Sequence, residues 1–437
     1  MASMSLTTAV VILAALFIGL PVAVALATSG LVLSYLFVDR SMLGIFGQMP
    51  WNVVTSTTIV AVPLFVLMGE LLARSGISEQ MYAAVGRLLN RLPGGLLHTN
   101  VVASGVFAAV CGSSVATAAT ICSVSVPPLR RRGYNESLAL GSIAAGGTLG
   151  ILIPPSVMFI VYGVLVEESI GELYIAGIVP GLLMIVVFMA IIFVMALYRP
   201  NIAPRGEIQP LTSKGRWKLL LSVIPTCFLI FLVLGTIYLG VATATEAAAF
   251  GVSGALVISG FMRTISIRMI SSAILATAAT TSMIVFILIG AFSLQFVITY
   301  LGLPAALSNW VTGLGLSPLQ FIILICVTYF LLGTFMEELS MVVTTIPIIL
   351  PMLHELHVNL VWFGVIMVIQ VQLALISPPV GMNLFVIQSI RTKLPNGPKN
   401  MTMGEIFVGV TPFVVGMLIV LALIIMFPEL ATWHDLK

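Results

Sequence analysis

Long apolar runs dominate this chain and leave almost no charge to cover a water-exposed surface. Of its 437 residues, 60% are hydrophobic and 8% are charged, whereas a soluble domain carries about 25% charged residues. A helix that spans a bilayer needs roughly 20 consecutive apolar residues. Runs near that length or longer occur at 6–37, 51–73, 137–166, 173–198, 219–245, 247–262, 271–299, 359–390 and 405–427. The sequence therefore predicts an all-α polytopic membrane protein with lipid around most of its surface.

Two further apolar runs, 94–129 and 318–353, are too long for one crossing, and we predict that they form re-entrant hairpins. Each contains glycine near its middle and proline near its end. With the N-terminus inside, nine crossings and two hairpins place all of the 18 Lys and Arg residues except Arg40 and Lys437 in inside loops. Because basic residues gather on the cytoplasmic side, we expect a bacterial inner-membrane protein with a cytoplasmic N-terminus and a periplasmic C-terminus.

The two halves of the chain resemble each other at a nearly constant offset, which predicts an internal repeat. The matched residues are Asn135 with Asn359 and Pro154–Pro155 with Pro378–Pro379, both 224 apart, and Gly112 with Gly333, 221 apart. Three residues are therefore inserted after the second hairpin tip. Five predicted crossings separate the hairpins, and an odd number turns the second copy upside down. Inverted repeats are typical of alternating-access transporters.

The repeat divides the chain into scaffold and transport segments. Scaffold spans with an interfacial arm helix are predicted in 1–93 and 219–317, and the two halves of a transport domain in 94–198 and 318–437. Each transport half contains a hairpin and a broken helix, 137–166 or 359–390, and the second also contains the last span, 405–427. The basic, proline-containing stretch 199–218 is predicted to be a cytoplasmic linker.

A Pro-Pro pair interrupts an apolar run in each half, at Pro154–Pro155 and Pro378–Pro379. Proline removes a backbone donor and clashes with the preceding turn, and the carbonyl oxygens that an unwound segment frees can bind a cation. With hydroxyls from the hairpin tips, they predict two Na⁺ sites. The first would use Ser113, Ser114, Gly147, Gly150 and Pro154, and the second Gly333, Thr334, Ser377, Pro378 and Gly381. A plain proline kink is the alternative for each break.

Three residues are candidates for binding a small organic anion. Ser156 and Asn383 lie about one turn beyond the two breaks, where a restarted helix directs its positive end. Glu337 and Glu338 end a stretch, 269–336, that has no charged residue. Because ionisable groups at membrane depth are usually functional, Glu337 is the third candidate, with a solvated tip at the outer surface as the alternative. The histidine and cysteine spacing indicates no transition-metal site.

The sequence also bears on two enzyme classes. It contains no Walker A pattern, so the chain carries no P-loop ATPase. Gly251-Val252-Ser253-Gly254 resembles the serine motif of a rhomboid-type intramembrane protease. A nucleophilic serine needs a base within hydrogen-bond reach, and no histidine lies within a predicted downstream crossing. We therefore expect no enzyme, and an intramembrane hydrolase stays a distant alternative.

Three segments together resemble the large permease subunit of tripartite ATP-independent periplasmic (TRAP) transporters: PLFVLMGE at 63–70, GGTLGILIPPS at 146–156 and PPVGMNLF at 378–385. The resemblance implies an elevator-type fold of the ion-transporter superfamily, Na⁺ coupling and uptake of an organic acid such as sialic acid or a C4-dicarboxylate. It also implies two partners, a small four-helix membrane subunit and a periplasmic substrate-binding protein, with no nucleic acid. Typical members have Asp at the position of Glu337. A stand-alone Na⁺/anion symporter of the same superfamily is the alternative.

The predicted topology can be tested with reporter fusions. A reporter placed after Lys437 should be active in the periplasm, and one placed at Lys214 should be active in the cytoplasm, because an odd number of crossings separates the two hairpins. Activity on the same side at both positions would contradict the inverted repeat.

Overall fold

The computed structural model describes residues 7–433 apart from 9, 13, 16–17, 40–41, 205–212, 314 and 395–401. These described residues form helices and no strand. In chain order the helices are α2 Val22–Phe37, α3 Leu43–Val54, α4 Ala61–Arg74, α5 Ile77–Leu89, α6 Leu96–Cys111, α7 Ser114–Arg131, α8 Glu136–Thr148, α9 Val157–Val166, α10 Ile170–Tyr198, α11 Ser213–Tyr238, α12 Ala244–Phe261, α13 Ile267–Tyr300, α14 Leu303–Gly313, α15 Pro318–Gly333, α16 Glu338–Glu355, α17 Leu360–Ile376, α18 Met382–Lys393 and α19 Met403–Met426. Short 3-10 turns occur at Leu149–Ile151, Pro200–Ile202 and Pro428–Leu430.

Four helices in the described part of the chain, α10, α12, α13 and α19, are long and apolar enough to cross a membrane. The bent pair α4–α5, which turns through 70°, would make a fifth if it forms one span. Several shorter apolar helices, among them α2, α6, α9, α15 and α17, accompany them. A multi-pass membrane protein follows from these helices and from the composition.

Two of the expected continuous spans are divided. The run 6–37 turns at Ile18–Gly19, and α2 begins only after Pro21. The run 51–73 is split between α3 and α4 by a turn region that contains Thr55, Ser56, Thr57 and Thr58. Proline favours a helix start over a helix interior, and side chains with hydroxyl groups compete for backbone hydrogen bonds. Hydrophobicity alone did not reveal these interruptions.

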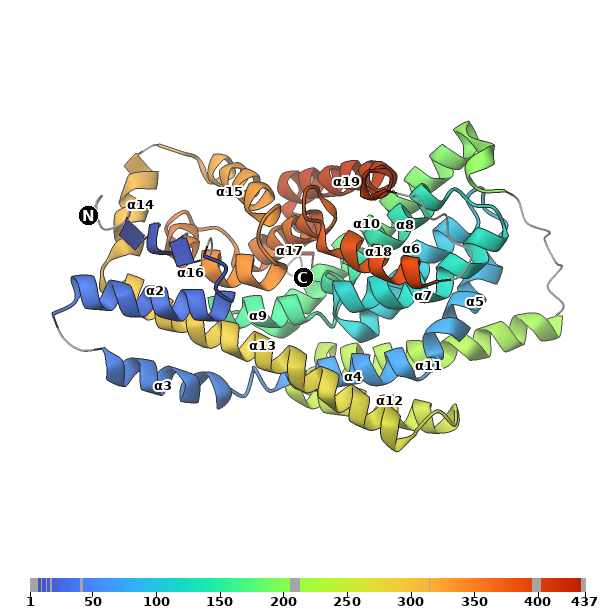
Figure 1. The fold of residues 1–437 in the computed structure, drawn as a ribbon, viewed down its shortest axis with the longest axis horizontal. Coiled ribbons are helices and arrows are strands. Elements are labelled where there is room, and N and C mark those ends of the chain that lie inside the picture. The colour runs from blue at the N-terminus through green and yellow to red at the C-terminus, as the bar shows by residue number, and fades with distance from the viewer. Residues whose placement is uncertain are drawn as a thin grey trace.

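Two groups of helices can be followed in Figure 1. The long helix α13 crosses the molecule diagonally with α2 alongside it, and α4 packs against both α12 and α13. The second group includes α6, α7 and α8, with α19 packed against α8 and α18 against α7. Helices from the two ends of the chain thus lie together in one body. Whether the groups correspond to a fixed scaffold and a moving domain stays a prediction, as does the inverted orientation of the halves.

The two halves have closely matched helices around the expected hairpins. Helices α6 and α15 have 16 residues each, and α7 and α16 have 18 each. The connection is 112–113 in the first half, which we call the first tip, and 334–337 in the second, the second tip. Two of the extra residues of the second half therefore lie in this connection.

Asparagine begins the next helix in each half. The Asn135 side chain accepts the N–H of Leu138 at 2.9 Å to start α8, and the Asn359 side chain accepts the N–H of Trp362 at 2.9 Å to start α17. Such a cap satisfies one of the N–H groups that a helix start leaves free. The helices then differ, because α8 ends at Thr148 whereas α17 continues to Ile376. The glycines at 146, 147 and 150 weaken the end of α8.

The asparagine caps can be tested by substitution. Asn359→Ala should lower the free energy of unfolding by about 1 kcal/mol, because it removes the acceptor for the N–H of Trp362, and Asn359→Ser should retain most of it. Reversible unfolding of the purified protein in mixed detergent and SDS micelles would measure the difference. Asn201→Ala, at an exposed position, is the matched control, and an equal effect there would contradict the role of the cap.

Candidate functional site

Each expected helix break is present and contains its proline pair. We call 149–156, between α8 and α9, the first break, and 377–381, between α17 and α18, the second break. The peptide bonds Pro154–Pro155 and Pro378–Pro379 are both cis. The first break is mostly buried, whereas Pro378, Pro379 and Val380 are exposed. The two breaks thus occupy different surroundings although their sequences match.

The first tip packs directly against the first break. Helix α6 ends where Gly112 takes a left-handed φ of 67°, which glycine adopts without steric cost. The Gly112 carbonyl accepts the N–H of Val157 at 3.3 Å, and the Ser113 hydroxyl caps α7 by accepting the N–H of Ala116 at 3.4 Å. The tip therefore satisfies a backbone donor at the start of α9.

Two glycines allow a close approach to the first tip and to α7, Gly150 in the first break and Gly147 near the end of α8. A Cβ atom on Gly150 would lie 2.4 Å from the Ser113 carbonyl oxygen, and one on Gly147 would lie 2.6 Å from the Ala118 Cβ. Neither distance is tolerable for real atoms, so these positions exclude larger side chains. The structure thus brings together Ser113, Gly147 and Gly150, with Ser114 and the buried Pro154 next to them in the chain.

The five residues predicted for the second Na⁺ site lie in more varied positions. A Cβ atom on Gly333 would lie 2.3 Å from the Ala374 Cβ, so α15 and α17 are in close contact there. The Thr334 hydroxyl donates to the Leu331 carbonyl of its own helix at 2.7 Å. Ser377 is buried, and its hydroxyl has no partner among the described residues. Gly381 starts α18 with a φ of 52°, while Pro378 is exposed.

Two predicted residues from opposite halves of the chain form a hydrogen bond. The Asn383 amide nitrogen donates to the Ser114 hydroxyl at 2.7 Å, and both side chains are fully buried. The Asn383 amide oxygen has no partner among the described residues. The second break is thereby tied to the first tip, and an unused buried acceptor is left beside this contact.

Ser156 lies at the junction of the first break and α9 and forms two local hydrogen bonds. Its hydroxyl donates to the Ile151 carbonyl at 2.6 Å and accepts the N–H of Phe159 at 3.3 Å. It therefore caps α9 and bridges the first break with its own hydrogen bonds. Its place in substrate binding stays a prediction.

Gln372 makes a contact that the sequence analysis missed. Its amide nitrogen donates to the Thr148 carbonyl at 2.8 Å, and the side chain is fully buried in α17. The two residues are 224 apart, which is the repeat offset, so matched positions of the halves touch. A polar amide inside an otherwise apolar run was the available signal.

A cavity of about 400 Å³ lies where both tips approach α4 and α13. Its walls come from both tips, from the first break, from α4, α7, α9, α13 and α16, and from the start of α18. The lining residues are Val66, Glu70, Cys111, Gly112, Ser113, Val115, Ala116, Ala119, Ile151, Val157, Met158, Thr280, Met283, Ile284, Glu337, Glu338, Leu339 and Met382. Glu337 is thus a cavity residue, as are Ser113 and the predicted tip residue Gly112.

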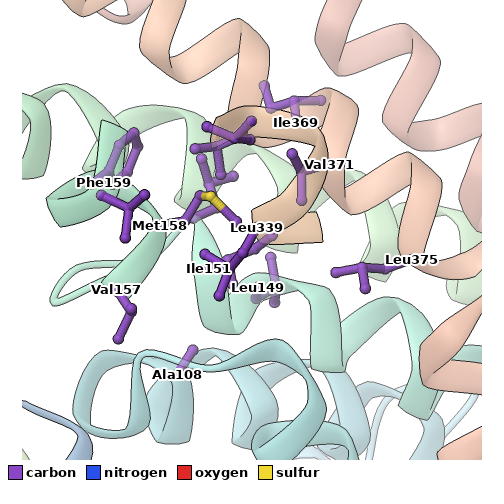
Figure 2. Close-up of a cluster of buried hydrophobic side chains, with 14 of the residues drawn as sticks. Ala108, Leu149, Ile151, Val157, Met158, Phe159, Leu339, Ile369, Val371 and Leu375 are labelled. Carbon is purple, nitrogen blue, oxygen red and sulfur yellow. The ribbon is translucent and has the colours of Figure 1, made fainter. Parts of the chain in front are cut away.

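An apolar cluster lies beside this cavity. In Figure 2, Leu339 at the start of α16 lies close to Met158 and Ile151, and other buried hydrophobic side chains, among them Val371 and Leu375 of α17, surround them. The cluster packs the start of α16, just after the second tip, near the first break and α9. Polar groups at the cavity are therefore backed by packed hydrophobic side chains.

The three cavity carboxylates have different partners. Glu70 forms an ion pair with Arg74, one turn along α4. Glu337 caps α16 by accepting the Ser340 N–H at 3.0 Å and the Ser340 hydroxyl at 2.9 Å. One carboxylate oxygen of Glu338 is buried without a partner among the described residues. No described lining residue is Lys, Arg or His.

The sequence analysis also missed a cluster of charged side chains that joins the end of α7, the start of α8 and the end of α18. Glu136 accepts from Arg130 and from Arg391 at 2.7 Å each, and Arg391 is 2% exposed. Arg130 also donates to the Leu394 carbonyl at 3.3 Å. Because its members are far apart in the chain, local sequence patterns could not assemble this cluster. It holds the first half to the second away from the cavity.

Ser253, the candidate nucleophile of the hydrolase alternative, donates its hydroxyl to the Ala249 carbonyl of its own helix at 2.9 Å. Such back-bonding is common for serine within apolar helices. The serine motif is thus accounted for as part of α12.

A family model and the sequence comparisons with known proteins agree on one family. Residues 9–430 match the family described as "Tripartite ATP-independent periplasmic transporter, DctM component". The C4-dicarboxylate TRAP transporter large permease protein DctM of Pseudomonas aeruginosa is 35% identical over 345 residues, covering 78% of this chain and 79% of that protein. The isethionate TRAP transporter permease protein DctMQ of Oleidesulfovibrio alaskensis is 32% identical over 384 residues, covering 86% of this chain and 59% of that protein. The crystal structure of the Alcanivorax borkumensis YdaH transporter matches with a TM-score of 0.64 at 15% identity, covering 97% of this chain and 98% of that one.

Because the first tip and the first break are in close contact, we expect that adding one methyl group there lowers the stability of the protein. Gly150→Ala should destabilise the protein by about 1–3 kcal/mol, because the added carbon would overlap the Ser113 carbonyl oxygen. The thermal unfolding midpoint in detergent should fall by several degrees. Gly44→Ala, where nothing lies within 4 Å of the new atom, is the control. Equal midpoints for both variants would contradict the close approach.

Proposed function

The chain belongs to the DctM family of tripartite ATP-independent periplasmic transporter components, and we propose that it is the large permease subunit of a Na⁺-coupled organic-acid importer. In this proposal a periplasmic binding protein delivers the substrate to the permease, and an elevator movement carries the substrate across the inner membrane. The relatives named for C4-dicarboxylates and isethionate suggest a small organic anion, with sialic acid as a further candidate.

The observation that carries this proposal is the convergence of helix N-termini on the cavity. Ser113 precedes α7, Val157 begins α9 and Met382 begins α18, and all three line the cavity. A helix N-terminus carries a partial positive charge that attracts anions, and it keeps this charge where capping groups already accept some of its N–H groups, as they do at Ala116, Val157 and Phe159. Since no described lining residue is basic, these backbone groups would supply the attraction for a carboxylate.

The proposed Na⁺ sites place cations close to the same cavity. The first site would consist of Ser113, Ser114, Gly147, Gly150 and Pro154. The second site would consist of Gly333, Thr334, Ser377, Pro378 and Gly381. The unpartnered hydroxyl of Ser377 supports this assignment, because a buried polar group without a partner is costly and Na⁺ prefers oxygen ligands. Na⁺ would then neutralise the substrate charge and lower the cost of moving it through the membrane.

The proposed elevator movement uses the boundary at which the cavity lies. Helices α4 and α13 would belong to the fixed scaffold, together with a small four-helix membrane subunit. The moving body would consist of both tips, both breaks, helices α6–α10 and helices α15–α19. The hydrogen bonds Asn383–Ser114 and Gln372–Thr148 support joint movement, since they join the two halves across the chain.

Reconstituted uptake tests the proposal. In liposomes that contain the permease and the small subunit, with binding protein and substrate outside, we expect uptake that requires an inward Na⁺ gradient. Ser114→Ala should raise the Na⁺ concentration for half-maximal uptake by about tenfold, because it removes a proposed Na⁺ ligand and also leaves the buried Asn383 amide without its acceptor.

Two controls accompany this measurement. Ser271→Ala removes an exposed hydroxyl that donates only locally, to the Arg268 carbonyl, and should leave the Na⁺ dependence unchanged. Uptake driven equally well by K⁺ or by a proton gradient alone would refute the Na⁺ sites. Full activity of the large subunit without either partner would favour the stand-alone symporter instead.

A further inference from the structure

Glu338 is an ionisable cavity residue to which the proposed transport mechanism gives no role. It begins α16 directly after the second tip, and one of its carboxyl oxygens is buried without a partner among the described residues. Of the other two cavity carboxylates, Glu70 is neutralised by Arg74. Glu337 accepts two hydrogen bonds from Ser340. Burial, not a bound partner, therefore decides whether Glu338 carries a charge.

In the described part of the chain, the helices around Glu338 bring no cation to it. Helix α16 packs against α2, α9, α13, α14, α15 and α17, and the cavity adds α4, α7, α18 and the end of α6. On all of these helices, every Lys, Arg and His other than Arg74 lies at least about 13 Å along the helix axis from the nearest lining residue.

The other ionisable side chains on these helices cannot neutralise Glu338 either. They are the acids Glu70, Glu337 and Glu355, and the tyrosines and cysteines Tyr35, Cys111, Cys122, Tyr162, Tyr300, Cys326 and Tyr329. Tyrosine and cysteine are uncharged at physiological pH. The charge next to Glu338 in the chain, on Glu337, has the same sign as an ionised Glu338 would have.

Two effects on the protonation of Glu338 oppose each other. The start of a helix favours the ionised carboxylate by about tenfold or less. Burial without a partner favours the neutral acid by up to about a thousandfold or more, and the adjacent charge of Glu337 acts in the same direction. Burial therefore outweighs the helix start, and Glu338 should hold a proton at neutral pH.

We infer that Glu338 is a proton-binding residue of the transport cycle, neutral while the cavity is closed and able to ionise when the second tip opens to water. The inference rests on the proposed elevator function, in which the cavity lies between the fixed and the moving parts. The proton comes from the water that enters the open cavity and returns to that water when Glu338 ionises. Because burying an unpaired charge is costly, the moving body crosses the membrane with Glu338 neutral.

Infrared spectroscopy of the purified full-length permease tests the protonation without transport. A neutral carboxylic acid has a C=O stretching band that a carboxylate lacks. At neutral pH, the spectrum of the unaltered protein minus that of Glu338→Gln should contain this band, and raising the pH should remove it. Glu429→Gln, at an exposed position, is the matched control and should give no such band, because a solvated glutamate is ionised at neutral pH.

Reconstituted uptake tests the role of the proton in transport. Liposomes with the permease and the small subunit receive binding protein outside, a fixed Na⁺ gradient and the same pH on both sides. Fumarate, isethionate and N-acetylneuraminate serve as probes, since all three stay ionised from neutral to alkaline pH. Uptake by the unaltered protein should fall as the pH rises, by up to about tenfold per pH unit at the alkaline end, because the neutral form of Glu338 becomes rarer.

Glu338→Gln keeps the size of the side chain and is neutral at every pH. This variant should retain uptake and lose the fall at alkaline pH, whereas Glu429→Gln should behave as the unaltered protein does. Because the binding protein is the same in all three measurements, its own pH dependence does not enter the difference. Thermal unfolding shows whether each variant is folded, and Glu338→Met, also neutral and of similar length, replaces Glu338→Gln if that variant is unfolded.

Each contrary result has a distinct meaning. Absence of the infrared band at neutral pH would overturn the inference and leave the proposed transport function intact. An equal fall of uptake with pH in the unaltered protein and in Glu338→Gln would also overturn it. So would loss of uptake at every pH by a folded Glu338→Gln variant, since a neutral side chain should suffice. Absence of Na⁺-driven uptake by the unaltered protein would instead refute the proposed function, and the infrared result would still decide the protonation of Glu338.

Discussion

The need to satisfy unpaired backbone groups inside an apolar environment controls this structure. Breaking a helix frees N–H and C=O groups that lipid cannot satisfy. At the first break the tip of the neighbouring helix pair covers them, with the Gly112 carbonyl accepting from Val157 and Gly150 lying against Ser113. A side-chain hydrogen bond joins the helix that follows the second break to the first tip region, since Asn383 donates to Ser114 across the two halves. The local architecture of the cavity follows from these contacts.

The same contacts tie the halves of the chain into one body. Gln372 donates to Thr148 near the middle of the structure, and Glu136 joins Arg130 to Arg391 at another end of the same helices. These links consist of polar groups within a largely apolar interior, where breaking a buried pair costs more than in water. The proposed elevator movement would require a body held together in this way.

The cavity is unusual for an anion site because its charged side chains are acidic. Attraction for an anion must then come from helix N-termini and from bound cations, both of which the surrounding breaks and tips can provide. The proposed coupling to Na⁺ depends on this arrangement.

The sequence by itself determined the membrane class and the positions of the breaks, because each depends on a local feature: the length of an apolar run or a proline pair. The sequence also identified Glu337 as a candidate site residue, because it is the first charged residue after a long uncharged stretch. Only the tertiary structure showed that the Ser156 hydroxyl caps a helix and that the runs 6–37 and 51–73 are interrupted. It also showed that Gln372 contacts Thr148 and that Glu136 contacts two arginines. The pairings join residues of separate helices, most of them more than 200 positions apart, so no local period contains them. The unpartnered oxygen of Glu338 became visible for the same reason, since a missing partner can be recognised only when all neighbours are in place.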